Sequence, residues 1–253
     1  MGEAVVAPDT GWRDELRSRA LAGLAGVDRT GYVELSAQIQ PPTAATQAAL
    51  YAAMQDATIS TFGWPIGVVL GNRDEYRPRP TVDGVQAEIP IVGGGFAGDR
   101  TSYDFWKVFG DGRFYTLMSL FEDERVENAL FWDTRTVRAT EGLLLLARLY
   151  RRLNASDNDH VAITIRHAGL AGRALHVANN NRMMMHRPTT NEDVVEAAFT
   201  TTLIGLETDI TALVRGIIDP LLAVFDFYNI DSGILDDIIE GYVAARSDRA
   251  GPQ

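Results

Sequence analysis

The sequence predicts an α+β protein with largely antiparallel sheets and a helical C-terminal segment. Alternating apolar and polar residues predict strands at 32–40 and 85–91. Strand pairs stand between helical blocks without a regular strand-helix-strand order, which favours antiparallel pairing. With 253 residues and 46% hydrophobic content, the chain has enough apolar material for a sizeable core. We interpret 1–253 as a single domain, with a weak candidate boundary in the polar stretch 154–159.

The first half of the chain predicts a series of short helices and strands. Trp12, Leu16, Ala20 and Leu24 are spaced four apart, which indicates an amphipathic helix over about 12–24. The elements expected next are the strand 32–40, an Ala-rich helix capped by Thr43, a short buried strand at 66–70, the strand 85–91, and a hairpin of 103–109 and 113–121 around Gly110-Asp111-Gly112.

The second half contains the most clearly predicted helix, from about 140 to 153, after a candidate strand at 129–132. Leu146 and Tyr150 are among four apolar residues at helical spacing, with Arg148 and Arg152 toward solvent. The elements expected next are a second hairpin of 160–167 and 173–178, a strand at 194–203, and helices at 207–227 and 231–246, with Pro220 kinking or splitting the first.

Net charge and composition exclude several classes of protein. The net charge is −11, so binding of nucleic acid by the whole surface is not expected. Only residues 113–187 are basic on balance, with 11 basic and 8 acidic side chains, whereas residues 188–253 carry 3 and 12. The chain has no cysteine, which excludes disulfides and thiolate chemistry. Neither a long apolar run nor a signal peptide is visible, so we expect a cytoplasmic protein without a membrane partner.

The sequence contains two groups of residue types that can ligate metals. All four histidines fall between 160 and 186, and in the predicted second hairpin His167 and His176 would be diagonal neighbours. Without a third ligand they make a poor zinc site. Glu122-Asp123-Glu124, together with Asp133, could hold a divalent cation, or could form a solvated turn with one acid paired to Arg125. We expect no metal site and no cofactor.

Two further segments draw attention by their composition. Gly93 to Gly98 matches G-x-G-x-x-G after a predicted strand, but no helix follows, so we interpret it as a loop. The segment 179–187 contains three asparagines and three methionines, and it could be an exposed binding loop or a buried crossing segment. Walker A, G-x-S-x-G and H-E-x-x-H motifs are absent from the sequence.

The basic middle segment supplies the best candidates for binding. Arg148 and Arg152 are four residues apart and share a helix face. Arginine forks suit phosphate and carboxylate groups, so these residues could contact an external anion, or they could neutralise the acidic C-terminal helices of the same chain. The predicted binding residues are Arg148, Arg152, Arg166, Arg173, Arg135 and His167.

Several short sequence segments together resemble segments of one bacterial module. They include Gly63-Trp64-Pro65-Ile66-Gly67, Ser119-Leu120-Phe121-Glu122-Asp123-Glu124-Arg125 and Phe131-Trp132-Asp133-Thr134-Arg135. Over about 50–230 the sequence resembles an uncharacterised module that follows the AlbA/Schlafen-type DNA-binding domain in bacterial proteins. The resemblance implies an accessory, sensing or interaction role in regulation or defence. It implies no catalytic residue, and no segment here resembles the DNA-binding domain itself.

These observations favour a non-enzymatic module that binds a partner protein or a small anionic ligand through its arginines. The alternative is a metal-assisted enzyme that uses Glu122, Asp123, Asp133 and the arginines on a phosphate-containing substrate. A third hypothesis is a homodimer formed through the acidic C-terminal helices. Convergence of Asp123 or Glu124, Asp133 and His167 on one pocket would favour the enzyme.

Overall fold

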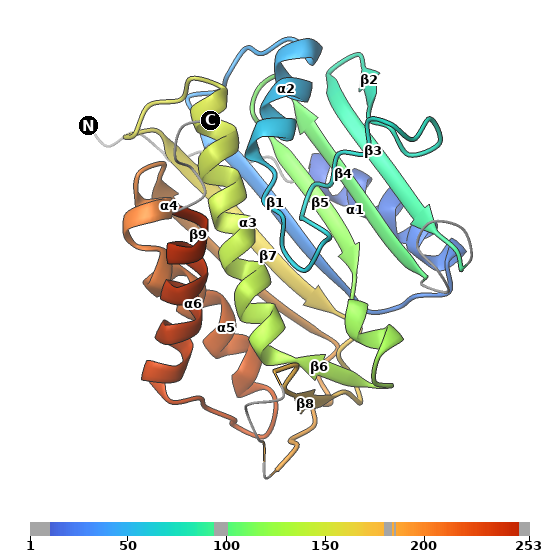
Figure 1. Ribbon diagram of the computed structural model, residues 1–253, viewed down its shortest axis with the longest axis vertical. Helices are drawn as coiled ribbons and strands as arrows, with labels where there is room; N and C mark the ends of the chain where they lie inside the picture. Colours follow the sequence, from blue (N-terminus) through green and yellow to red (C-terminus); the bar gives the residue numbers. More distant parts are fainter. Residues whose placement is uncertain (1–10, 94–100, 180–183, 185, 248–253) are drawn as a thin grey trace.

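A computed structural model describes residues 11–93, 101–179, 184 and 186–247 of the chain. Its centre is a seven-stranded antiparallel sheet in the order β2-β3-β4-β5-β1-β7-β9 (Figure 1). The α+β fold class with antiparallel pairing is therefore confirmed. The strands are β1 (Tyr32–Gln40), β2 (Arg79–Thr81), β3 (Gly84–Ile91), β4 (Ser102–Phe109), β5 (Phe114–Ser119), β7 (His160–Ala168) and β9 (Val194–Thr202).

Strand β1 lies in the interior of the sheet and pairs with β5 on one side and β7 on the other. The alternating sequence of β1 places Val33 and Leu35 on one face of the sheet and Glu34 and Ser36 on the other, as predicted. Both faces of β1 are buried, unlike the half-exposed strand that the alternation predicts. The reason is that helices cover both faces of the sheet.

Helix α1 (Gly11–Gly26) packs on one face of the sheet. Leu16, Ala20 and Leu24 point into a cluster of aromatic and aliphatic side chains from β4 and β5. Their four-residue spacing is the one that predicts this helix from the sequence. The cluster on this face includes Tyr32, Tyr103, Phe105, Phe109, Tyr115 and Leu117.

The opposite face carries the larger core and most of the helices (Figure 1). Helix α3 (Trp132–Arg152) crosses this face and packs against α2 (Gln47–Ala57), α5 (Ile210–Ala223) and α6 (Ser232–Ser247). Leu143, Leu146, Leu149 and Tyr150 are all fully buried, so the predicted apolar side of this helix is confirmed. Two short pieces complete the helices, η2 (Phe121–Glu124) and α4 (Gly205–Thr208).

The second predicted hairpin is wrong. Strand β7 pairs with β1 and β9, while β8 (Ala174–His176) forms a small parallel sheet with β6 (Ala129–Phe131). Gly169 and Gly172 have positive φ and turn the chain away from β7 instead of back along it. His167 and His176 are therefore not cross-strand neighbours.

Other differences concern helix ends and one strand. Thr46, not Thr43, caps α2, and the Thr43 hydroxyl donates to the Gly110 carbonyl instead. The stretch 66–70 is a turn at 66–67 followed by irregular chain, not a strand. Helix α3 begins eight residues before Thr140, and the predicted helix at 207–227 is divided at Asp209 instead of at Pro220.

Two of the segments singled out by composition fall mainly outside the described residues. The glycine-rich loop is described only at Gly93, and the 179–187 segment only at 179, 184, 186 and 187. The polar stretch 154–159 connects α3 with β7, and the strands after it join the same sheet as the strands before it. Among the helices of the described residues, none is long and apolar enough to cross a membrane.

Candidate functional site

The three consecutive acids after β5 form ion pairs with three different arginines of the same chain. Glu122 is fully buried, and none of the three acids forms an ion pair with Arg125, which stacks over the Phe121 ring. The expectation of a solvated turn paired to Arg125 is therefore wrong. The ion pairs are Glu122 with Arg135, Asp123 with Arg173, and Glu124 with Arg29.

Two of the predicted binding arginines are structural. Arg135 lies 2.9 Å from Glu122, and both side chains are almost completely buried. Arg173 is also buried and donates to the backbone carbonyls of Gly169 and Ala129. Burial raises the pKa of Glu122, and the adjacent guanidinium of Arg135 opposes that shift. Because both side chains are buried, the expectation that Arg135 and Arg173 contribute to an open binding face is wrong.

The residues named for the enzyme hypothesis do not meet in one pocket. The Asp133 carboxylate accepts hydrogen bonds from the backbone N–H groups of Ala178 and Asn179, which fixes the chain after β8. His167 lines a small cavity between β7 and α3 whose lining does not include Asp133, and Asp123 is held by Arg173. Over the described residues there is no group of three His, Asp or Glu side chains that could hold a metal ion.

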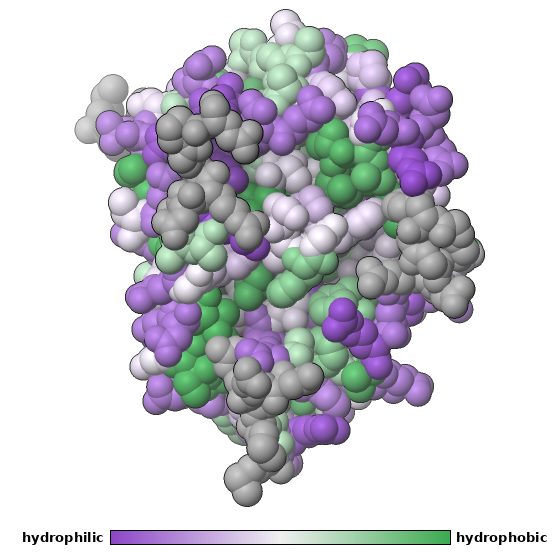
Figure 2. Space-filling model, viewed as in Figure 1, coloured by the Kyte–Doolittle hydropathy of each residue, from purple (hydrophilic) through white to green (hydrophobic). Residues whose placement is uncertain are grey.

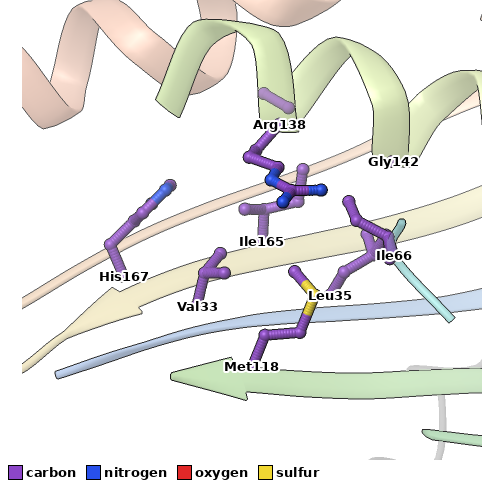
Figure 3. A pocket seen from close by; sticks show the side chains of 9 residues that line it. Val33, Leu35, Ile66, Met118, Arg138, Gly142, Ile165 and His167 are labelled. Atoms are coloured by element: carbon purple, nitrogen blue, oxygen red, sulfur yellow. The ribbon is translucent and has the colours of Figure 1, made fainter. Parts of the chain in front are cut away.

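A small cavity lies between α3 and the sheet (Figure 3). Its volume is about 20 Å³, room for about one water molecule. Figure 3 shows Arg138 reaching from α3 toward the sheet, above Met118 and Leu35, with His167 at the side of the cavity. Burial lowers the pKa of His167 to about 3, and the nearby positive charge of Arg135 adds to this effect. The cavity is too small for a substrate.

Two buried acids that the sequence analysis did not single out, Glu141 and Asp104, are neighbours of residues that line this cavity. Arg138 pairs with Glu141 at 2.7 Å, and Glu141 also accepts the backbone N–H of Ile66. Asp104 is buried and accepts the indole N–H of Trp64 at 2.9 Å. Burial raises the pKa of Asp104 to about 6, although the Trp64 hydrogen bond works in the opposite direction. These contacts attach the irregular segment after α2 to α3 and the sheet.

Arg166 is separated from the other candidates by the sheet. It alternates with Ile165 and His167 on β7, so it lies on the α1 face, and it forms an ion pair of 3.3 Å with Glu196 of β9. Of the remaining histidines, His160 and His186 are exposed, and His176 lies beside the Phe131 ring. The six predicted binding residues therefore do not form one site.

Arg148 and Arg152 do line a groove, at the C-terminal end of α3. The groove has a volume of about 490 Å³. Figure 2 shows hydrophilic residues interspersed with hydrophobic ones along the upper edge of the view, and Figure 1 shows that α3 finishes at this end. The lining residues are Asp56, Thr58, Ile59, Ser60, Arg148, Arg151, Arg152 and Arg246.

The arginines of this groove have few acidic partners. Arg148 is half-buried and forms no ion pair or hydrogen bond with any described residue. Arg152 approaches Asp56 only at 3.5 Å, and both side chains are largely exposed. Arg151 is the well-paired member, because it binds Asp157 and Glu207, and its hydrogen bond to Glu207 raises its pKa.

The C-terminal helix contributes a fourth arginine to the groove. Arg246 of α6 lies with its guanidinium 4.8 Å from the centre of the Tyr242 ring, and none of the described carboxylates forms an ion pair with it. The idea that the arginines face acidic helices of the same chain holds for Arg151 and Glu207. Arg148 differs, because the residue that α6 contributes to its groove is another arginine, Arg246, and not an acid.

Sequence reasoning missed Arg246, Glu141 and Asp104. The only signal for Arg246 is that it is one of three basic residues after position 187, and nothing in the sequence places it beside α3. The pairing of Arg138 and Glu141 follows helical spacing and could have been noticed. Asp104 belongs to a predicted strand, where its inward orientation depends on the register.

Comparisons with known proteins add no relative. No family model matches the chain, and neither the curated proteins nor the solved structures contain a match. The resemblance to the module behind AlbA/Schlafen-type domains therefore stays a prediction.

Proposed function

We propose that this chain binds a small anionic ligand, such as a phosphate-bearing metabolite, in the groove formed by Arg148, Arg151, Arg152 and Arg246. The observation that carries the proposal is Arg148, a half-buried arginine without a partner among the described residues and surrounded by other cations. A guanidinium loses hydration when it is partly buried, and an anion would compensate for that loss.

The size and charge of the groove support a small ligand over a protein partner. A volume of about 490 Å³ lies within the range of roughly 300–1,000 Å³ that is typical of small-molecule sites. The described lining residues include four arginines and one carboxylate, Asp56, a balance of +3 in a protein of net charge −11. The exposed Ser60 offers a hydroxyl donor at the same place.

The alternative, an enzyme acting on a phosphate-containing substrate, has less support. Among the described lining residues the only carboxylate is Asp56, which lies beside Arg152, and there is no histidine. A general base or metal ligands would be required for hydrolysis. Recognition without chemistry is the function that this arrangement of side chains supports best.

Titration calorimetry with pyrophosphate at low ionic strength tests the proposal. We expect binding by the natural protein and about a 10- to 100-fold loss of affinity in Arg148→Gln, because a hydrogen bond to a charged group contributes about 1.5–3 kcal/mol. Affinity should fall as salt is added, since exposed charges are screened.

The matched control is Arg166→Gln, which removes another half-buried arginine on the opposite side of the sheet. It should leave the affinity unchanged. Equal losses in the two variants, or no binding by the natural protein, would refute the proposal. Release of orthophosphate during the titration would favour the enzyme alternative instead.

A further inference from the structure

The two edges of the central sheet differ in how well they are protected against pairing. The β2 edge is three residues long and contains Arg79 and Pro80, and proline has no N–H to offer to another strand. The β9 edge is nine residues long, pairs regularly with β7 over its whole length, and contains neither proline nor glycine. Figure 1 shows these strands at opposite ends of the sheet.

The outer side of β9 has unused backbone groups. Within the part of the chain that the structure describes, β9 exchanges backbone hydrogen bonds with β7 alone. Its sequence, Val-Val-Glu-Ala-Ala-Phe-Thr-Thr-Thr, is rich in residues that favour strands. A long, regular and largely uncharged edge is a template for another strand.

The charge of the edge identifies the kind of strand that fits. Its one charged side chain, Glu196, already forms an ion pair with Arg166 of the neighbouring strand β7. The edge is therefore close to neutral, and nothing on it selects a basic or an acidic peptide. An uncharged strand of similar composition is the best complement, and the chain itself contains one.

We propose that β9 pairs antiparallel with β9 of a second copy, about a two-fold axis at Ala198, joining the two sheets into one. In this register Glu196 faces Thr200 and Ala197 faces Phe199, so like charges are not opposed and a small side chain faces a large one. Ala198 faces its own copy, and its small, exposed side chain permits close approach. This contact differs from the dimer through the C-terminal helices that was the third hypothesis from the sequence, and it is independent of the arginine groove.

Because the chain has no cysteine, single cysteines can test this register directly. In Ala198→Cys the two thiols lie opposite each other, with Cα atoms about 4.5–5.5 Å apart, within the range for a disulfide. In Thr200→Cys the thiols are displaced by four residues, or roughly 13 Å, which is too far. Val82→Cys, fully exposed next to β2, is the control at the opposite edge.

Under mild oxidation we expect cross-linked dimer from Ala198→Cys at least ten times faster than from Thr200→Cys or Val82→Cys. The cysteine-free protein should sediment as a concentration-dependent dimer that strengthens with salt, because the copies carry like net charge. Ala198→Lys should shift it to monomer with an unchanged circular dichroism spectrum, whereas Val82→Lys should not. A protein that stays monomeric at all concentrations, or cross-linking dominated by Thr200→Cys, would overturn the proposal.

Discussion

Asp104 is a buried acid on the sheet face beneath α3, in a row of neighbouring residues that includes Ile89 and Met118. Among the described residues, the Trp64 indole is its one hydrogen-bond donor, and this bond compensates only part of the cost of burying a charge. The pKa of about 6 means that the folded protein binds a proton here more tightly than the unfolded chain does. This single residue therefore makes the folding stability depend on pH.

The first prediction concerns the sign of that dependence. The Asp104 contribution is complete below about pH 4 and is lost as the pH rises through 6, which amounts to about 3 kcal/mol for this shift in pKa. Asp104→Asn keeps an acceptor for Trp64 without the charge, so it should be more stable than the natural protein at pH 7.

Urea denaturation at several pH values between 4 and 7.5 provides the measurement. The difference in free energy of unfolding between Asp104→Asn and the natural protein should grow as the pH rises from 4 to about 6 and then level off. Buried Glu122 and Glu141 also have raised pKa values, but they are present in both proteins and cancel in the difference. A difference that is independent of pH would contradict the burial argument.

The Glu122–Arg135 pair leads to a second prediction at the residue scale. Removing one partner of a buried pair leaves the other charge without compensation, so Arg135→Met should cost about 3–5 kcal/mol in the free energy of unfolding. In the double variant Glu122→Gln, Arg135→Met, the glutamine can still accept the Phe131 N–H. The double variant should therefore be more stable than Arg135→Met alone, and additive losses would show that the pair is not coupled.

At the scale of elements, α3 links the core to the groove. Its first half carries buried polar residues that bind η2 and the segment after α2, while its second half buries leucines and ends in arginines. Arginines in a last turn also interact favourably with the partial negative charge at a helix C-terminus. That effect accounts for Arg151 and Arg152 without a ligand, but it does not explain the fourth arginine from α6.

Leu146→Ala tests the packing of this helix. Leu146 is fully buried, so its truncation should destabilise the protein by about 2–5 kcal/mol, as cavities in well-packed cores do. A change smaller than about half a kcal/mol in denaturant titrations would mean that α3 does not pack as described. Arg148→Ala, two residues further along the helix at a half-buried position, is the control and should change stability little.

The elements also show what the sequence could predict. The strands at 32–40 and 85–91 and the hairpin around Gly110 were predictable, because their patterns are local. The partners of β7 were not predictable. Its partner β1 lies more than a hundred residues away in sequence, and the local sequence around β7 does not show that it pairs with β1 and not with β8. For the same reason the burial of Arg135 and Arg173 could not be predicted, since their partners come from a different element.

At the scale of the whole molecule, the structure shows where the arginines of the basic middle segment lie. Three arginines of 113–187 form buried or largely buried ion pairs with Glu122, Asp123 and Glu141, and three others, Arg148, Arg151 and Arg152, lie together at the end of α3. Helical spacing predicted that Arg148 and Arg152 share a face. The groove around them exists because α2 and α6 end beside α3, which is a property of the tertiary structure.

A cluster of cations that serves a ligand should not be needed for folding. In Arg148→Glu, Arg152→Glu the repulsion among the arginines is reduced, and exposed pairs such as Arg152–Asp56 contribute little. The double variant should therefore unfold with a free energy within about 1 kcal/mol of the natural value. If the arginines instead hold the C-terminal third in place, the same variant should be strongly destabilised.

Thermal melting with and without pyrophosphate is the measurement that separates these accounts most directly. We expect the natural protein to melt higher with pyrophosphate, because a ligand that binds only the folded state stabilises it. The double variant should melt within about 2–4 °C of the natural protein without ligand, and pyrophosphate should not change its Tm. A much lower Tm for the unliganded variant, or an undiminished response to pyrophosphate, would contradict a ligand site at Arg148.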